Sequence, residues 1–214
     1  MMQSPECKFP NLPASIISNP DWHKVFTMPA MDAALAKITD QVRTAAADQR
    51  PLRIRGGGTK DFYGQALQGE LLDTTGLNGI VSYEPSELVV TARCGTRLAE
   101  LEQVLAQQGQ LLAFEPPHFG PGATVGGMVA AGLSGPSRAA VGSARDYVLG
   151  LHMLNGRGES LQFGGQVMKN VAGYDVSRLL CGSLGTLGLV TEISLKVLPH
   201  ATARATLRFE LDQS

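Results

Sequence analysis

Glycine is concentrated in two short segments of this sequence, and these segments constrain the fold more than any other feature. Three glycines are consecutive at residues 56–58, and several more lie among other small residues at 120–132. The chain has 25 glycines in 214 residues, more than the roughly 7% of average usage would give. Because glycine has no Cβ, its backbone can approach a ligand or another backbone closely. Both segments therefore predict close backbone approach.

The first segment, Arg55-Gly56-Gly57-Gly58-Thr59-Lys60, follows a predicted strand over residues 51–55. Successive glycine N–H groups can converge into a concave nest that binds an anion. Thr59 can add a hydroxyl and Lys60 a positive charge. A solvent-exposed turn fits the same pattern, and this loop alone supports the two interpretations equally.

The second segment, Gly122-Ala123-Thr124-Val125-Gly126-Gly127, opens a helix that we predict to begin at Thr124. Unpaired N–H groups and the positive dipole end favour a phosphate at the start of a helix. Packing of the helix against a sheet through small residues is the alternative. Two anion-binding loops in one chain suit a diphosphate, so the two loops together indicate a diphosphate site more strongly than either loop alone.

Several familiar catalytic and nucleotide-binding motifs are absent. Three Gly-x-Gly pairs occur, but none completes GxGxxG because their sixth residues are Asp61, Val125 and Leu161, and GxxxxGK[ST] does not occur. Neither GxSxG nor HExxH is present. The sequence therefore disfavours a Rossmann site, a P-loop and a hydrolase, and the residues alone indicate binding more than catalysis.

The composition is that of an ordinary globular protein, with 43% hydrophobic and 17% charged residues. A net charge of -1 supplies no broad positive field, so nucleic acid is not an expected partner. Cys7, Cys94 and Cys181 are far apart and in no CxxC spacing, which argues against a disulfide framework, a metal site or an iron–sulfur cluster. No signal pattern and no run of ~18 apolar residues occurs. We therefore predict a cytoplasmic protein without a membrane span.

Periodicity divides the chain into four parts. Residues 1–28 form a proline-rich N-terminal lead-in without periodicity. Residues 29–83 form a first subdomain with one helix of about four turns and three short strands. Residues 84–200 form a larger second subdomain. Residues 201–214 begin another strand-like run, which we expect to be the start of a substrate-binding cap domain.

Strands alternate with short helices in the expected subdomains. Asn-Gly at residues 155–156, between two apolar runs, predicts an antiparallel hairpin. Residues 187–198 alternate as a final strand with both faces partly buried. The other expected helices cover residues 31–45, 98–109 and 175–180, and one more begins at residue 124. The other expected strands cover residues 51–55, 70–73, 79–83 and 88–93. We predict an α+β fold with two subdomains: a small α/β unit, and a larger mixed or antiparallel sheet with flanking helices.

From Met28 to Leu198 the sequence resembles the FAD-binding domain of the vanillyl-alcohol-oxidase type, also called the PCMH-type domain. Arg55 to Lys60 resembles the pyrophosphate loop of that family, and Pro121 to Ala131 its second flavin-binding segment. Gly142 to Gly150 resembles a third segment and Gly182 to Thr191 the closing strand. The resemblance implies FAD between the two subdomains, with its diphosphate on N–H groups of both glycine loops.

Within that family two segments are most similar to the FAD-binding subunits of bacterial glycolate oxidases. They are Gly132-Leu133-Ser134-Gly135-Pro136-Ser137-Arg138 and Met168-Lys169-Asn170-Val171-Ala172-Gly173-Tyr174-Asp175. This similarity implies that the flavin takes a hydride at N5 from the α-carbon of glycolate or a similar 2-hydroxy acid. It also implies that electrons leave through an iron–sulfur subunit, next to a second flavoprotein subunit, with the complex cytoplasmic or held at the inner membrane by these partners.

The sequence departs from the family pattern in two ways. Members that attach flavin covalently can carry histidine at the position of Thr59, so threonine implies non-covalent FAD. Members normally continue into a substrate-binding cap, whereas only about fifteen residues follow Pro199. The catalytic acid and base therefore stay unassigned. An FAD-binding module without activity of its own, or a dehydrogenase for another substrate such as D-lactate, are alternatives.

The resemblance assigns the cofactor contacts mainly to backbone and small side chains of these segments. The residues are Arg55, Gly56, Gly57, Gly58, Thr59, Lys60, Pro121, Gly122, Ala123, Thr124, Gly126, Gly127, Ala130, Gly135, Gly142, Ser143, Asp146, Gly188 and Val190. Motif position places Lys169, Asn170 and Tyr174 nearest the reactive face of the flavin, with a buried turn as the alternative. Asp146 could instead hydrogen-bond within its own loop, and His118 could be a capping or core histidine instead of a flavin contact.

Overall fold

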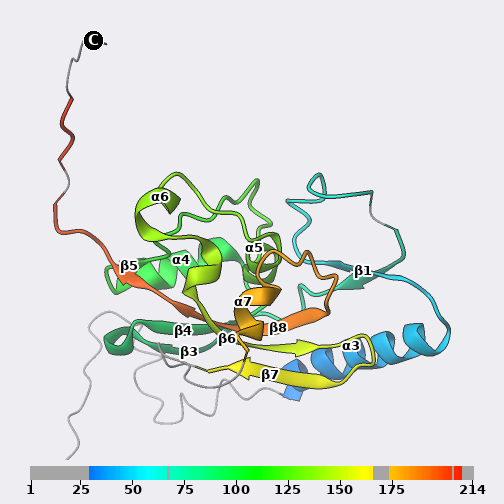
Figure 1. Ribbon diagram of the computed structural model, residues 1–214. Coiled ribbons are helices and arrows are strands. Elements are labelled where there is room, and N and C mark those ends of the chain that lie inside the picture. The colour runs from blue at the N-terminus through cyan, green and yellow to red at the C-terminus, as the bar shows by residue number, and fades with distance from the viewer. Residues whose placement is uncertain (1–28, 67, 166–173, 204, 209–214) are drawn as a thin grey trace, which may run out of the picture.

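Two β-sheets of different topology organise the protein (Figure 1). The structure is a computed structural model that describes residues 29–66, 68–165, 174–203 and 205–208. The expected lead-in over residues 1–28 lies outside the described residues, and so do Lys169 and Asn170.

A helix and a parallel strand pair form the first unit. Helix α3 (Pro29–Ala47) precedes strands β1 (Leu52–Arg55) and β2 (Glu70–Asp73), which confirms three of the predicted elements. The strands run parallel, with Leu52 opposite Glu70 and Arg55 opposite Asp73. Parallel strands end at the same edge of a sheet, so the glycine loop after Arg55 begins beside Thr74, whose N–H donates to the Arg55 carbonyl (3.0 Å).

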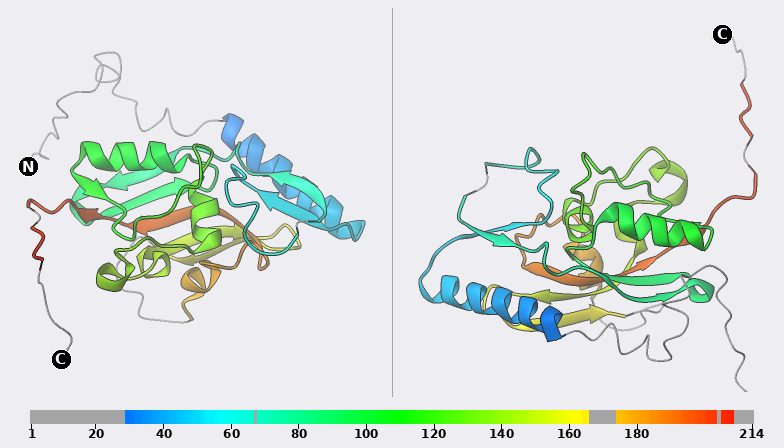
Figure 2. Two further views of the ribbon diagram at one scale, coloured as in Figure 1. Left: turned by 90° about the horizontal axis from the view of Figure 1, so that it is seen from above. Right: turned by 180° about the vertical axis from the view of Figure 1, so that it is seen from behind.

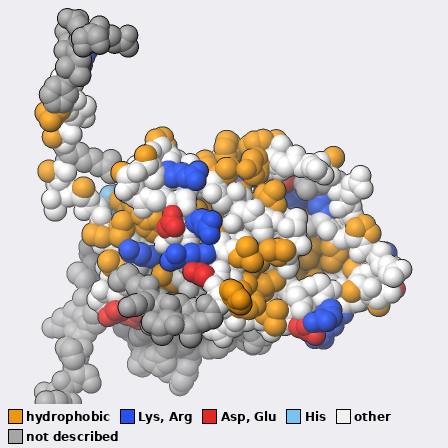
Figure 3. All heavy atoms as spheres, in the orientation of Figure 1, with side chains coloured by type: hydrophobic (Ala, Val, Ile, Leu, Met, Phe, Trp, Pro, Cys, Tyr) orange, Lys and Arg blue, Asp and Glu red, His pale blue; other side chains and the backbone are white. Residues whose placement is uncertain are grey.

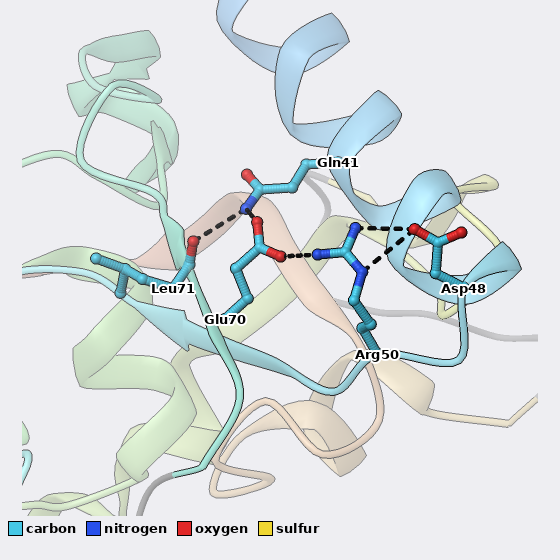
Figure 4. Close-up of polar contacts among 5 residues, drawn as sticks. All are labelled: Gln41, Asp48, Arg50, Glu70 and Leu71. Carbon is cyan, nitrogen blue, oxygen red and sulfur yellow. Dashed lines mark hydrogen bonds and ion pairs between the residues drawn. The ribbon is translucent and has the colours of Figure 1, made fainter.

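Polar contacts connect α3 to β2 (Figure 4). The Gln41 amide donates to the Leu71 carbonyl (3.0 Å) and to the Glu70 carboxylate (3.1 Å). Arg50, just after the helix, pairs with Asp48 (3.0 Å) and with Glu70. All of the side chains in these ion pairs are about half exposed. Such pairs contribute only about 0–1 kcal/mol each, so they orient α3 more than they stabilise it.

The second sheet has five strands, and every neighbouring pair is antiparallel, in the order β3-β4-β8-β6-β7. The strands are β3 (Ile80–Glu84), β4 (Val89–Arg93), β6 (Val148–Leu154), β7 (Ser160–Gly164) and β8 (Leu189–Lys196). Central β8 is buried on both faces, as the sequence predicted. A separate short pair joins β5 (Gln110–Leu111) to β9 (Leu198–Pro199).

Short helices cover one face of the larger sheet (Figures 1 and 2). Helix α4 (Leu98–Gln107) buries Leu98, Leu101 and Leu105 completely, at the spacing of one helical face. Helix α5 (Val125–Ala131) packs against β4 and β8. The remaining helical segments are α6 (Arg138–Val141), α7 (Val176–Leu180), η1 (Pro85–Glu87) and η2 (Ala144–Tyr147). The predicted α+β architecture is confirmed.

The β6-β7 hairpin connects the two units. The hairpin prediction is confirmed, but Gly158 adopts the left-handed conformation (φ +68°) and Gly156 does not. The Gly158 carbonyl accepts a hydrogen bond from Arg43 of α3 (3.2 Å). A Cβ on Gly158 would lie 2.7 Å from Cγ of Arg43. The contact with α3 therefore requires glycine at this turn.

Two expectations concern the ends of the subdomains. Strand β3, which the sequence placed in the first subdomain, pairs with β4 in the larger sheet, so strand pairing alone would divide the chain before Ile80. The division at residue 83 stays a prediction. The expected strand-like run after residue 200 is wrong for the described residues 201–203 and 205–208, none of which is in a strand.

Candidate functional site

The first glycine loop presents free backbone donors. Within the described part of the chain, the N–H groups of residues 57–60 have no acceptor. The loop closes through a bond from the Asp61 N–H to the Gly58 carbonyl (3.3 Å). Arg55 braces its base by pairing with Asp61 (2.7 Å). Converging free N–H groups of this kind form an anion-binding concavity.

The second glycine segment contacts the first loop directly. A Cβ added to Gly57 would lie 1.5 Å from the carbonyl oxygen of Gly122, so only glycine fits at position 57. Arg97 fixes that carbonyl by donating to it from Nη1 (2.7 Å). A Cβ on Gly56 would meet Oγ1 of Thr124 at 2.5 Å. The two segments therefore form one wall with almost no side chain between them.

The second segment does not supply the free donors that the sequence predicted. Helix α5 has seven residues, and its first three amides already have acceptors: Val125 donates to the Thr96 carbonyl (2.9 Å), Gly126 to the Cys94 carbonyl (2.7 Å) and Gly127 to Oγ1 of its N-cap Thr124 (3.2 Å). The expectation of unpaired N–H groups at this helix is therefore wrong. Tertiary packing of the helix start against residues 94–96 uses the donors, and the sequence gives no sign of that neighbour.

Two adjacent cavities lie along this wall. One of about 120 Å³ is bounded by Arg55, Gly56, Gly57, Gly58, Thr59, Lys60, Thr124, Gly127 and Ala130 among the predicted site residues. The other, of about 80 Å³, is bounded by Gly56, Gly126, Gly127, Ala130, Gly188 and Val190 among them. Ligand pockets usually measure roughly 300–1,000 Å³. A dinucleotide would have to span both cavities and extend over the surface.

Ser183 and Leu184 are residues that the sequence analysis did not select. Ser183 borders the smaller cavity, and its buried Oγ has no hydrogen-bond partner among the described residues. Leu184 borders both cavities in the left-handed region, with φ +52°. An orphaned hydroxyl and a strained backbone at a cavity both indicate a ligand site. The only sequence signal was the position of these residues within the closing segment.

Seven predicted site residues line neither cavity. They are Pro121, Gly122, Ala123, Gly135, Gly142, Ser143 and Asp146. Asp146 bonds within its own loop, accepting from the N–H and the hydroxyl of Ser143 (2.8 Å each). Both bonds hold the pKa of the Asp146 carboxyl below its usual value, and the bond from the backbone N–H of Ser143 has the larger effect. The geometry favours the local role that the sequence left open for Asp146.

The side chains at the cavities include a partly buried cation, Lys60, and a buried thiol, Cys94. Lys60 borders the larger cavity, and partial burial lowers the pKa of its ammonium from the usual 10.5. Cys94 borders the smaller cavity, and burial raises the pKa of its thiol to about 12. At neutral pH Lys60 is a cation available to an anionic ligand, whereas Cys94 is a neutral thiol.

The other candidates lie away from the cavities. Nε2 of His118 lies 2.9 Å from a carboxylate oxygen of Glu102 on α4, which favours a structural role for this histidine. The side chain of Tyr174 is 95% exposed. Among the described residues, no group of three or more His, Cys, Asp or Glu could hold a metal ion. No described helix is both long and apolar enough to span a bilayer.

A sequence model of the family described as "FAD binding domain" matches residues 30–164, which is more than half of the chain. This chain belongs to the FAD-binding domain family. The match confirms the PCMH-type resemblance and establishes FAD as the cofactor. Free N–H donors, a wall without side chains and an orphaned hydroxyl fit a dinucleotide at the two cavities.

Characterised relatives match most of the chain. It is 53% identical over 174 residues to glycolate oxidase subunit GlcE of Escherichia coli (strain K12), covering 81% of this chain and 50% of that protein. It is 38% identical over 132 residues to D-lactate dehydrogenase of Anaerostipes hadrus, covering 61% of this chain and 27% of that protein. Glycolate oxidase subunit GlcD of Bacillus subtilis (strain 168) is 33% identical to it over 184 residues, covering 82% of this chain and 39% of that protein. The chain spans half or less of the length of these relatives.

A solved structure shows the same fold. An alkyldihydroxyacetonephosphate synthase superposes with a TM-score of 0.63 at 23% identity, covering 78% of this chain and 31% of that chain. This similarity agrees with the predicted α+β fold.

Proposed function

We propose that this chain is the FAD-binding part of a glycolate oxidase subunit that acts on glycolate or a similar 2-hydroxy acid. The 53% identity to a glycolate oxidase subunit supports this assignment above the others. The chain covers half of that relative, so substrate, partners and activity are all part of the proposal.

We propose that the FAD diphosphate lies on the free N–H groups of residues 57–60, with the Lys60 ammonium beside it. The observation that carries this placement is the contrast in donors: residues 57–60 have free amides within the described chain, whereas the amides of residues 125–127 are used. Ser183 would supply a hydrogen bond in the smaller cavity, next to Gly188 and Val190. The remaining predicted contacts at residues 121–123, 135, 142, 143 and 146 would act by shaping the wall or the neighbouring loops.

Two side chains support reversible binding of FAD. Thr59 offers no imidazole for a covalent bond to flavin, and its side chain packs close to Gly120 and Gly122. The thiol of Cys94 is neutral at neutral pH because burial raises its pKa to about 12, so it is a poor nucleophile. We therefore propose that the cofactor is held without a covalent link.

When bound, FAD supplies the redox chemistry by accepting a hydride equivalent from the α-carbon of the hydroxy acid. The part of this chain is to bind and orient the cofactor through the wall of Gly56, Gly57 and Gly122. We propose that electrons pass to partner chains, an iron–sulfur subunit and a second flavoprotein subunit. The complex would be cytoplasmic or held at the inner membrane through those partners.

Two other functions have a specific observation in their favour. The identity to a D-lactate dehydrogenase supports D-lactate as an alternative substrate. The cavities beside the glycine segments offer a cofactor site, which fits an FAD-binding module without activity of its own as the other alternative.

The visible spectrum of the purified chain, before and after acid precipitation, tests cofactor and linkage together. The proposal predicts flavin absorption and FAD in the supernatant; flavin retained in the precipitate would contradict reversible binding. Bleaching of the flavin by glycolate, but not by D-lactate, in the assembled complex would support the proposed substrate. Bleaching by D-lactate alone would favour the alternative, and no bleaching by either would favour an inactive module.

A further inference from the structure

Two exposed aromatic rings meet between the two glycine segments. Hydrophobic side chains lie in several groups on the face drawn in Figure 3, and the exposed side chains of Phe62 and Phe119 contact each other. Their ring centroids are 5.1 Å apart at an interplanar angle of 72°, the edge-to-face geometry that aromatic pairs prefer. Phe62 follows the first glycine loop and Phe119 precedes the second segment. The pair therefore links the two segments at the surface.

Phe119 is held in an unfavourable backbone conformation. Its φ is +56°, in the left-handed region that side chains other than glycine rarely adopt. Such a conformation persists only where the surrounding structure imposes it, and it is frequent at ligand sites. Burial does not explain it, because Phe119 is 55% exposed. This backbone conformation holds the Phe119 ring at the surface beside the first loop.

The ammonium of Lys60 lies over this ring. Its Nζ is 5.7 Å from the ring centroid of Phe119, within the range of a cation–π interaction. Lys60 also borders the larger cavity with Gly57, Gly58 and Thr59. Partial burial lowers the pKa of Lys60, which agrees with an ammonium held against protein instead of extended into water.

We propose that Phe119 is a positioning residue that holds the Lys60 ammonium over the diphosphate site, with Phe62 bracing the Phe119 ring. We call Lys60, Phe62 and Phe119 the aromatic clasp. The clasp explains why strained backbone supports an exposed phenylalanine between two cofactor-binding segments. This inference rests on the proposed placement of the diphosphate at residues 57–60.

A double-mutant cycle on FAD affinity tests the clasp. We expect Phe119→Leu to weaken FAD binding about fivefold, the size of a cation–π contact, and Lys60→Met to weaken it about tenfold. The double variant should bind FAD no more weakly than Lys60→Met, because Phe119 would act through Lys60. Riboflavin, which has no diphosphate, should show no change with Phe119→Leu.

Two further variants separate positioning from loop packing. Phe119→Trp keeps an aromatic face and should bind FAD as well as the parent chain, whereas Leu179→Ala, at an exposed position on α7, should change nothing. Equal weakening by Phe119→Leu in the parent and in the Lys60→Met background would overturn the clasp, and so would unchanged FAD affinity in Phe119→Leu. A parent chain that takes up no FAD would instead count against the proposed function.

Discussion

The two glycine-rich segments look alike in sequence but use their backbone differently. Within the described chain, the amides of residues 57–60 have no acceptor, whereas those of residues 125–127 bond to Thr96, Cys94 and Thr124. The first segment is therefore available to a ligand, and the second is used to build the fold. A glycine-rich segment indicates that the backbone lies close to something else. The hydrogen-bond partners of its amides show whether that neighbour is a ligand or another part of the protein.

The neighbours of the individual glycines show the same difference. Gly57 faces the carbonyl of Gly122 across the wall, while Gly126 packs on Cys94 in the core, where an added Cβ would lie 2.6 Å from the Cβ of Cys94. Substitutions in the first segment should therefore lower FAD affinity, and Gly57→Ala should also lower stability because it separates the loop from Gly122, whereas substitutions in the second segment should act mainly on folding.

Gly57→Ala should have the largest effect. Its Cβ would lie 1.5 Å from the Gly122 oxygen, so the two segments must move apart. We expect FAD affinity to fall at least ~100-fold and the free energy of unfolding to fall by roughly 3 kcal/mol. Flavin titration and denaturant unfolding of the apo chain measure both. Gly76→Ala is the matched control, because the nearest atom to its Cβ would be 3.9 Å away; an equal effect of both changes would refute the steric argument.

Gly126→Ala should act on stability more than on affinity. Its Cβ would meet buried Cys94, and repacking costs about 1–3 kcal/mol, although alanine regains up to about 1 kcal/mol of helix propensity. We expect the free energy of unfolding of the apo chain to fall by about 1–2 kcal/mol. A loss of FAD affinity as large as in Gly57→Ala, without a loss of stability, would contradict the division between the segments.

Thr124→Ala should cost about 1 kcal/mol of unfolding free energy, because it removes the side-chain cap from the Gly127 amide. Thr124→Ser keeps the hydroxyl and should retain most of that stability. Thermal or denaturant unfolding of the three apo chains gives the comparison. If alanine and serine destabilise equally, the cap is not what the threonine contributes.

FAD affinity should depend on pH through Lys60, with the smallest effect of the four. Burial lowers the pKa of Lys60 from 10.5, and a bound diphosphate would raise it by favouring the ammonium. Binding therefore takes up a proton, and affinity should fall as pH rises through the lowered pKa toward 10.5. In the apo chain the sign is opposite: the unfolded state binds more protons in that window, so this residue adds stability as pH rises.

Lys60→Arg isolates the contribution of Lys60, because arginine keeps its charge over the whole range. The difference in pH dependence between the parent and this variant removes the titration of the flavin itself. Identical pH profiles for the two chains would show that the ammonium does not contact the cofactor.

Sequence periodicity predicted most of the fold because its elements carry strong local signals. The amphipathic pattern of residues 31–45 and the double-faced apolar run of β8 appear in the structure as expected. The turn between β6 and β7 was placed correctly, and the left-handed Gly158 closes it locally by donating its N–H to the Asn155 carbonyl (2.9 Å). The Gly158 carbonyl also accepts a hydrogen bond from Arg43. That partner is 115 residues away in the sequence, which no local pattern reports.

The part of the site that depends only on local backbone conformation was predictable from the sequence. Three consecutive glycines after a strand indicated the loop at residues 56–58, and the structure brings it to the second segment. The acceptors of the α5 amides and the orphaned hydroxyl of Ser183 depend on tertiary contacts. Asp146 was assigned to the cofactor by motif position, whereas its hydrogen bonds are local.

Amide hydrogen exchange of residues 57–60 and 125–127, with and without FAD, distinguishes amides that bind the cofactor from amides that build the fold. We expect the amides of residues 57–60 to exchange rapidly in the apo chain and to gain protection when FAD binds. The amides of residues 125–127 should already be protected without FAD and should change little. New protection at residues 125–127, with none at residues 57–60, would refute the assignment of the diphosphate to the first glycine loop.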